Sequence, residues 1–167
     1  MLNVSIRNDR RKNNMDIKPE HEIVDCNSLS QKDQRGLILH ILYACDANDY
    51  STIFENIVEN IARGFDLIIP KDSFVYTTSK AIVENRESLD DNYKHMIDNW
   101  RFERVGVCTK LILRLAFWEL LNTDTPASII INEAIELAKC FAEQDSYKFI
   151  NGILDEYIKS KERQASS

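Results

Sequence analysis

The chain has 167 residues, which is a typical length for one domain with a sizeable core. Its net charge of −6 excludes a uniformly basic protein that grips nucleic acid without regard to sequence, so any such binding needs a local patch or charge from a partner. The four glycines and three prolines are too few for a β fold with many turns and favour long helices.

Residues 1–28 are polar and lack periodicity, and we expect a disordered or loosely held leader. Within residues 7–12 of it, Arg7, Arg10, Arg11 and Lys12 stand against a single acid, Asp9. This run is interpreted either as a solvated tail or as an auxiliary basic arm, Arg10, Arg11 and Lys12, that touches phosphates.

From Ser30 the pattern becomes helical. Two stripes of apolar residues recur with a period near 3.6, and each predicts a helix. Ser30 is the predicted N-cap of the first helix and Ser51 that of the second. The stripes are Leu37, Ile38, Ile41, Leu42 and Cys45, then Ile53, Phe54, Ile57, Val58 and Ile61. The second helix is expected to stop near Gly64.

Five further helices follow in the same way. Pro70 and Asp72 are expected to open one through Val83, and Ser88 another. Residues 105–121 are apolar nearly all round, which predicts a central helix covered by its neighbours. Helix starts are then predicted at Thr125 with Pro126 and at Asp145 or Ser146, and residues 161–167 are read as a polar tail.

No strand pattern of comparable strength occurs. The sequence therefore predicts an all-α domain over residues 29–160 with about seven helices. The last two helices carry polar or helix-weakening residues where a simple bundle would have alanine. Asn132 falls at the edge of an apolar face, and Gly152 costs about 1 kcal/mol relative to alanine, which predicts packing too tight for a Cβ.

A series of residues in the C-terminal half is specific enough to suggest a family. The stretches are ILRLA (112–116) with ELL (119–121), Pro126, INEAIELAK (131–139), Phe141 and KFINGIL (148–154), preceded by Trp100 with Arg104 and, more weakly, by LHILY (39–43). In these positions the chain resembles the NusB-type transcription antitermination factors over roughly residues 30–158.

The resemblance implies a fold and a function. It implies two small helical bundles that share a central helix, and no cofactor or catalysis. Members bind the boxA element of ribosomal RNA transcripts with a small-subunit ribosomal protein, NusE, and join an RNA polymerase complex that resists termination.

By the same resemblance, the RNA surface would comprise Lys32, Arg35, Tyr43, Asp145 and Phe149. Aromatic rings stack on bases, guanidinium groups hold phosphates, and a carboxylate accepts from a base amino group. Alternatives stay open, because Tyr43 and Phe149 could be core aromatics and Asp145 could serve only as a helix cap.

The chain departs from the family at the head of the first helix. Members usually carry a dense arginine run there, but this sequence reads SQKDQR (30–35), with two basic residues and one acid. Each lost phosphate contact weakens RNA binding and its salt dependence. We expect the basic arm or the ribosomal partner to compensate.

Two other classes of function compete. One is a protein-interaction or sequestering module that has lost RNA affinity, such as a homodimer burying the RNA face. The other is an enzyme, which we do not expect, because His21, His40 and His95 lie in different segments and no catalytic motif occurs. Glu133 and Glu136 are read as a solvated face rather than a metal pair.

The sequence also bears on compartment and metal content. Its four cysteines, Cys26, Cys45, Cys108 and Cys140, form no CxxC pair, so we expect neither a zinc site nor a redox dithiol but reduced, core-filling thiols in the cytoplasm. The start MLNVSIRNDRRKNN has no apolar core, and the run LILRLAFWELL is short and interrupted by charges. Neither a signal peptide nor a membrane span is expected.

Overall fold

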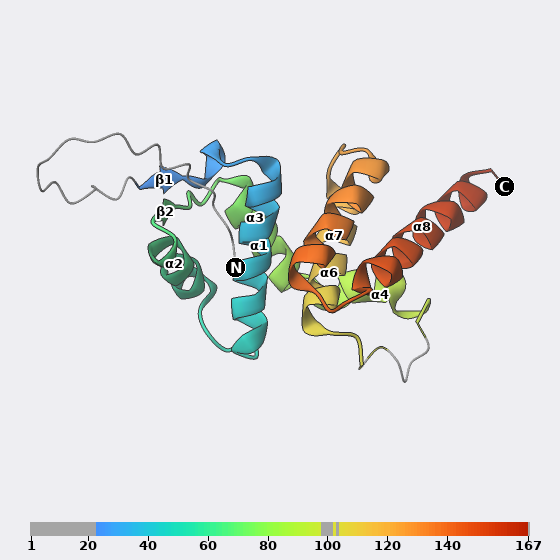
Figure 1. The fold of residues 1–167 in the computed structure, drawn as a ribbon, viewed down its shortest axis with the longest axis horizontal. Coiled ribbons are helices and arrows are strands. Elements are labelled where there is room, and N and C mark those ends of the chain that lie inside the picture. Colours follow the sequence, from blue (N-terminus) through green and yellow to red (C-terminus); the bar gives the residue numbers. More distant parts are fainter. Residues whose placement is uncertain (1–22, 98–101, 103, 167) are drawn as a thin grey trace, which may run out of the picture.

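The computed structural model describes residues 23–97, 102 and 104–166. The predictions that concern Arg10, Arg11, Lys12 and Trp100 lie outside the described residues. Within them the chain forms seven α-helices (Figure 1), which confirms the all-α class. They are α1 (Gln31–Ala47), α2 (Phe54–Gly64), α3 (Phe74–Glu84), α4 (Arg86–Lys94), α6 (Val107–Asn122), α7 (Ala127–Phe141) and α8 (Ser146–Ala165).

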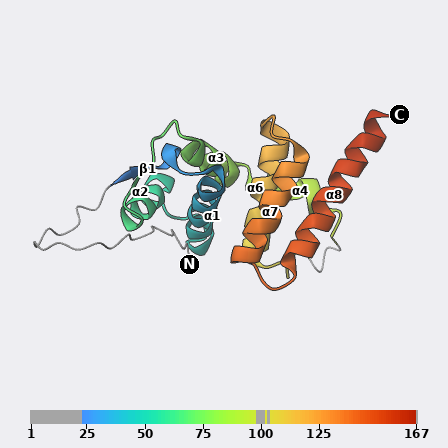
Figure 2. The same ribbon diagram turned by 45° about the horizontal axis from the view of Figure 1, so that its top comes forward.

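Helix α6 is the centre of the molecule. Every residue from Leu111 to Phe117 is buried, and the helix packs against α1, α3, α4, α7 and α8. In both views α1, α2 and α3 lie on one side of it and α7 and α8 on the other (Figures 1 and 2). The predicted arrangement of two small bundles that share a central apolar helix is thus confirmed.

Helix α1 begins where the sequence predicts. The hydroxyl of Ser30 accepts a hydrogen bond from the backbone N–H of Asp33 at 3.1 Å, which caps the helix, and donates to the Asp33 carboxylate at 2.6 Å. Helix α2 begins later than predicted. Ile53 occupies its cap position, and the hydroxyl of Ser51 instead donates to the carbonyl of Asn48.

The starts of α3 and α4 also differ by a few residues from the prediction. Ser73, rather than Pro70 or Asp72, caps α3 by accepting from the backbone N–H of Tyr76 at 3.2 Å. Helix α4 begins at Arg86, ahead of Ser88. Such shifts arise because several polar residues in each connection can cap, and only tertiary packing selects one.

The fold also contains two very short strands that the sequence did not reveal. Strand β1 (Val24–Asp25) pairs in parallel with β2 (Leu67–Ile68), and Cys26, which follows β1, is fully buried. Regular structure therefore begins before residue 29, within the predicted leader, and α8 continues past residue 160. Two residues are too few to show a period of two, which explains the omission.

A buried ionic cluster joins α4 to α6. Arg114 donates to both carboxylate oxygens of Asp90 at 2.8 Å and to the hydroxyl of Tyr50 at 2.9 Å, while the hydroxyl of Tyr93 donates to Asp90 at 2.8 Å. Burial raises the pKa of Tyr93 and Asp90 raises it further, so this phenol stays neutral and remains a donor.

No helix among the described residues is long and apolar enough to cross a membrane.

The prediction about Gly152 is wrong. This residue lies on the exposed side of α8, and a Cβ built there meets no heavy atom within 4 Å. We therefore expect Gly152→Ala to raise the free energy of unfolding by about 1 kcal/mol through helix propensity alone, measured by urea denaturation. Gly106→Ala is a contrasting variant, because Gly106 is the N-cap of α6 and a Cβ there would displace the Glu143 carboxylate. A Gly152→Ala variant no more stable than the parent would contradict this account.

Candidate nucleic-acid interface

Two of the predicted residues are exposed aromatic rings. Tyr43, on α1, keeps 52% of its surface exposed, and Phe149, in the first turn of α8, keeps 37%. Neither is a core aromatic, which removes the alternative left open by the sequence. Exposed rings of this size on a folded surface are available for stacking.

The segments that carry the two rings both approach the start of α6. The carboxylate of Glu143, in the turn between α7 and α8, accepts hydrogen bonds from the hydroxyls of Thr109 (3.4 Å) and Ser146 (3.2 Å). Burial raises the pKa of the Cys108 thiol, and the neighbouring carboxylates Glu143 and Asp46 raise it further. Since Asp46 is one turn beyond Tyr43, the end of α1 and the turn before α8 both approach the first turn of α6.

Asp145 precedes α8 in a left-handed conformation, with φ of 69°. It occupies the cap position, but its side chain makes no capping hydrogen bond. The carboxylate instead forms an exposed ion pair with Lys148 at 2.8 Å. Because exposed pairs of this kind contribute little free energy, the carboxylate can exchange Lys148 for another donor.

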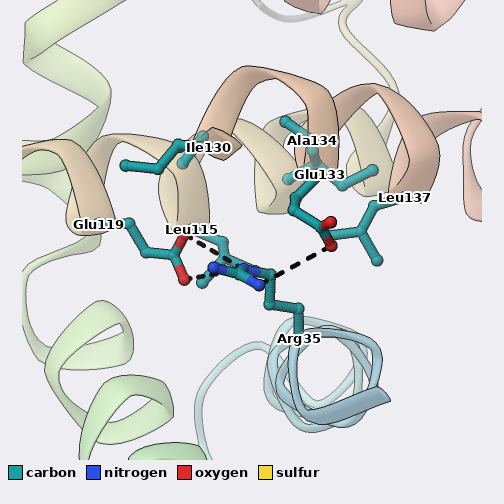
Figure 3. A pocket seen from close by; sticks show the side chains of 9 residues that line it. Arg35, Leu115, Glu119, Ile130, Glu133, Ala134 and Leu137 are labelled. Carbon is teal, nitrogen blue, oxygen red and sulfur yellow. Dashed lines mark hydrogen bonds and ion pairs between the residues drawn. The ribbon is translucent and has the colours of Figure 1, made fainter. Parts of the chain in front are cut away.

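Arg35 does not lie where the prediction needs it. It is only 4% exposed, and its Nε donates to both carboxylate oxygens of Glu119 at 3.0 and 3.2 Å, while Nη1 is 3.8 Å from Glu133 (Figure 3). The guanidinium bridges α1, α6 and α7 in the interior. A phosphate could reach it only after this buried ion pair broke, so Arg35 is a structural residue in this fold.

Lys32, by contrast, is exposed at the start of α1. It lies close enough to α7 to join Lys139 in lowering the pKa of Glu136. About three turns of α1 separate it from Tyr43, roughly 16 Å along the helix axis. The structure therefore keeps Lys32 on the surface, about three helical turns from Tyr43.

The sequence reasoning missed a cluster on α7 and α8. The ammonium groups of Lys139 and Lys148 each lie 5.7 Å from the centre of the half-buried Tyr147 ring. Each lysine is also paired with a carboxylate three residues away, Glu136 and Asp145 respectively. The surface beside Phe149 consequently carries balanced charges rather than a basic patch.

The side chain of His40 helps to hold α1, the helix that carries Tyr43. Its imidazole packs between the rings of Phe65 (5.3 Å) and Phe141 (5.5 Å), which join α1 to the ends of α2 and α7. Burial lowers its pKa, so the ring is neutral near pH 7. His40 lies one turn before Tyr43 on α1, and this packing fixes the backbone that carries the exposed ring.

The cysteines only partly fit the prediction of core-filling thiols. Cys26 and Cys45 are buried, but Cys108 is partly exposed and Cys140 is exposed. All four are free thiols. Among the described residues, no group of three histidine, cysteine or acidic side chains could hold a metal ion.

Comparison with known proteins assigns the fold to a family. The model of the NusB family matches residues 32–159. The chain is 33% identical to the transcription antitermination protein NusB of Macrococcus caseolyticus, over 80% of this chain and 99% of that protein, and 36% identical to the NusB of Campylobacter jejuni strain RM1221, over 76% and 94%.

A solved structure agrees. The structure of T. maritima NusB superposes with a TM-score of 0.66 at 28% identity, covering 78% of this chain and 92% of that one. The residues matched by the family model, 32–159, include Tyr43, Glu143 and Phe149. The chain therefore belongs to the NusB family, whose curated relatives are named transcription antitermination proteins.

Proposed function

We propose that this protein is a non-enzymatic, cytoplasmic antitermination factor that binds boxA RNA of ribosomal RNA transcripts together with the ribosomal protein NusE. The pair would join the RNA polymerase complex and keep it processive. The observation that carries this proposal is the exposure of Tyr43 and Phe149 in a chain of the NusB family.

The chemistry of the surface suits a single RNA strand. Unpaired bases stack on aromatic rings with about 1–3 kcal/mol per base, largely without regard to sequence. Asp145, four residues before Phe149, can accept a hydrogen bond from a base amino group. Lys32 can hold a phosphate farther along α1. Tyr147, Lys139 and Lys148 border the same face.

The electrostatics argue for a partner. Arg35 is engaged inside the protein, and Lys139 and Lys148 are already paired with carboxylates. With a net charge of −6, the chain alone offers few cations for counterion release. A basic ribosomal protein bound beside the rings would supply the missing charge, so affinity should rise in the complex.

The same scarcity of unpaired cations favours a second candidate function. In this alternative, the protein binds the ribosomal partner, or a second copy of itself, without holding RNA. The exposed rings would then be covered by protein. Both functions predict binding of the partner, and they differ in whether RNA joins the complex.

The test uses the full chain, the ribosomal partner and a boxA RNA oligomer, alone and in combination. We expect weak RNA binding by the chain alone and at least a tenfold gain when the partner is added, measured by fluorescence anisotropy at fixed salt. A scrambled oligomer serves as the control for sequence preference. A complex of the two proteins that holds no RNA, even at low salt, would reject the proposal in favour of sequestering.

A further inference from the structure

Two lysines outside the predicted site gather beside one ring. The ammonium groups of Lys94, the last residue of α4, and Lys110, in the first turn of α6, lie 5.2 and 4.8 Å from the centre of the Phe102 ring. Phe102 is only 7% exposed and packs against the buried Tyr93. The anchored ring holds two flexible cations near each other on the surface.

Three other lysines are already held by carboxylates. Lys80, Lys139 and Lys148 all form ion pairs with carboxylates. Within the part of the chain that the structure describes, neither Lys94 nor Lys110 does so. A cation held against a ring face keeps most of its ammonium hydrogens free for other acceptors. Lys110 also lies in the first turn of α6, where the helix dipole adds positive potential.

A hydrogen bond and helix packing connect the region of the lysine pair to the segment that carries Phe149. Lys110 follows Thr109, whose hydroxyl donates to Glu143 in the turn that leads to Asp145 and Phe149. Helix α8 packs against α6, and Figures 1 and 2 show α4 beside α8, on the side of the molecule away from α1.

We propose that Lys94 and Lys110 bind phosphates of the RNA strand whose bases stack on Tyr43 and Phe149. The RNA strand then crosses the start of α6 from α1 toward α4, and its phosphates contact Lys94 and Lys110 beyond the two stacked bases. This inference rests on the proposed function and gives the strand a path. It also supplies two cations to a surface on which Lys139 and Lys148 are already paired.

The test compares the salt dependence of RNA binding. The double variant Lys94→Gln with Lys110→Gln, in complex with the ribosomal partner, is titrated with boxA RNA carrying a few extra nucleotides at each end, from 50 to 300 mM salt. Loss of two phosphate contacts on a single strand should reduce the slope of log K against log salt by about 1.4. Replacing both lysines with arginine should retain the slope.

A matched double variant, Lys71→Gln with Lys159→Gln, removes two exposed lysines elsewhere and should behave like the parent. If the parent binds RNA and the Lys94 and Lys110 variant has the same slope as this control, the proposed path is wrong while the proposed function stands. If the parent complex binds no RNA at all, the proposed function fails, and the path fails with it.

Discussion

Replacing Arg35 with alanine is expected to lower the free energy of unfolding by about 3–5 kcal/mol. The substitution leaves the Glu119 carboxylate, 2% exposed, without the guanidinium that donates to both its oxygens. It also removes the only cation that the structure places near Glu133 Oε2, a buried atom with no hydrogen-bond partner among the described residues. Urea unfolding of the variant and the parent measures the loss.

The loss should depend on pH with a definite sign. Burial raises the pKa of Glu119, and Arg35 lowers it only in part, so removing Arg35 raises it further. A carboxyl whose pKa is raised in the folded state favours folding when it is protonated. The deficit of the variant should therefore be largest near pH 7.5 and shrink as the pH falls toward 5.

Two controls separate charge from packing. The double variant Arg35→Met with Glu119→Leu removes both charges and should regain most of the stability, because an apolar replacement of a buried ion pair is often neutral or stabilising. Lys32→Gln, on the same helix but exposed, should change stability by less than about 0.5 kcal/mol. A loss below about 1 kcal/mol for Arg35→Ala would mean that the buried pair contributes little.

The Arg35 double variant also tests whether this arginine touches RNA. If the guanidinium stays inside, the slope of RNA binding against salt should equal that of the parent. Lys32→Gln should instead reduce the slope by about 0.7, the value for one phosphate contact on a single strand. An Arg35 variant that shows the Lys32 behaviour would restore Arg35 to the RNA surface.

The sequence contained a signal for the interior position of Arg35. Arg35 precedes Ile38 by three residues and Leu42 by seven, so the helical period places it on the apolar stripe of α1. The resemblance to a family with an arginine-rich helix start pointed to the surface instead. Periodicity was the better guide, because burial follows the face of the helix on which a residue lies.

The central helix carried the matching signal. An apolar segment covered on every side leaves no face for water, so Arg114 and Glu119 within it must each find a partner of opposite charge. Their partners, Asp90 and Arg35, come from other helices and are far apart in the sequence. Periodicity thus predicts that the ion pairs exist, but only the packing of helices identifies them.

Other features could not be read from the sequence. The turn that carries Glu143 packs on the first turn of α6 through a long-range contact, which no local pattern predicts. The lysine pair at Phe102 likewise joins α4 to α6 across a connection without periodicity. Gly152 was misread because its cost in a helix was taken as evidence of close packing.

Replacing both Tyr43 and Phe149 with alanine is expected to weaken RNA binding by the complex by about 2–6 kcal/mol, if each ring stacks one base. Each single variant should lose about 1–3 kcal/mol, or roughly 5- to 150-fold in affinity. The two losses should nearly add, because the rings lie on different helices and the structure records no ring contact between them. Anisotropy titrations at constant salt measure each value.

The leucine variants of the same residues decide what the rings do. Leucine keeps the apolar bulk but cannot stack, so Tyr43→Leu and Phe149→Leu should lose as much RNA affinity as the alanine variants while binding the ribosomal partner normally. Leu121→Ala and Ile129→Ala remove exposed apolar side chains elsewhere and should change nothing. If leucine restores RNA affinity, or if both alanine variants bind RNA like the parent, the rings do not stack on bases. If alanine and leucine alike abolish partner binding, the rings contact the protein partner instead.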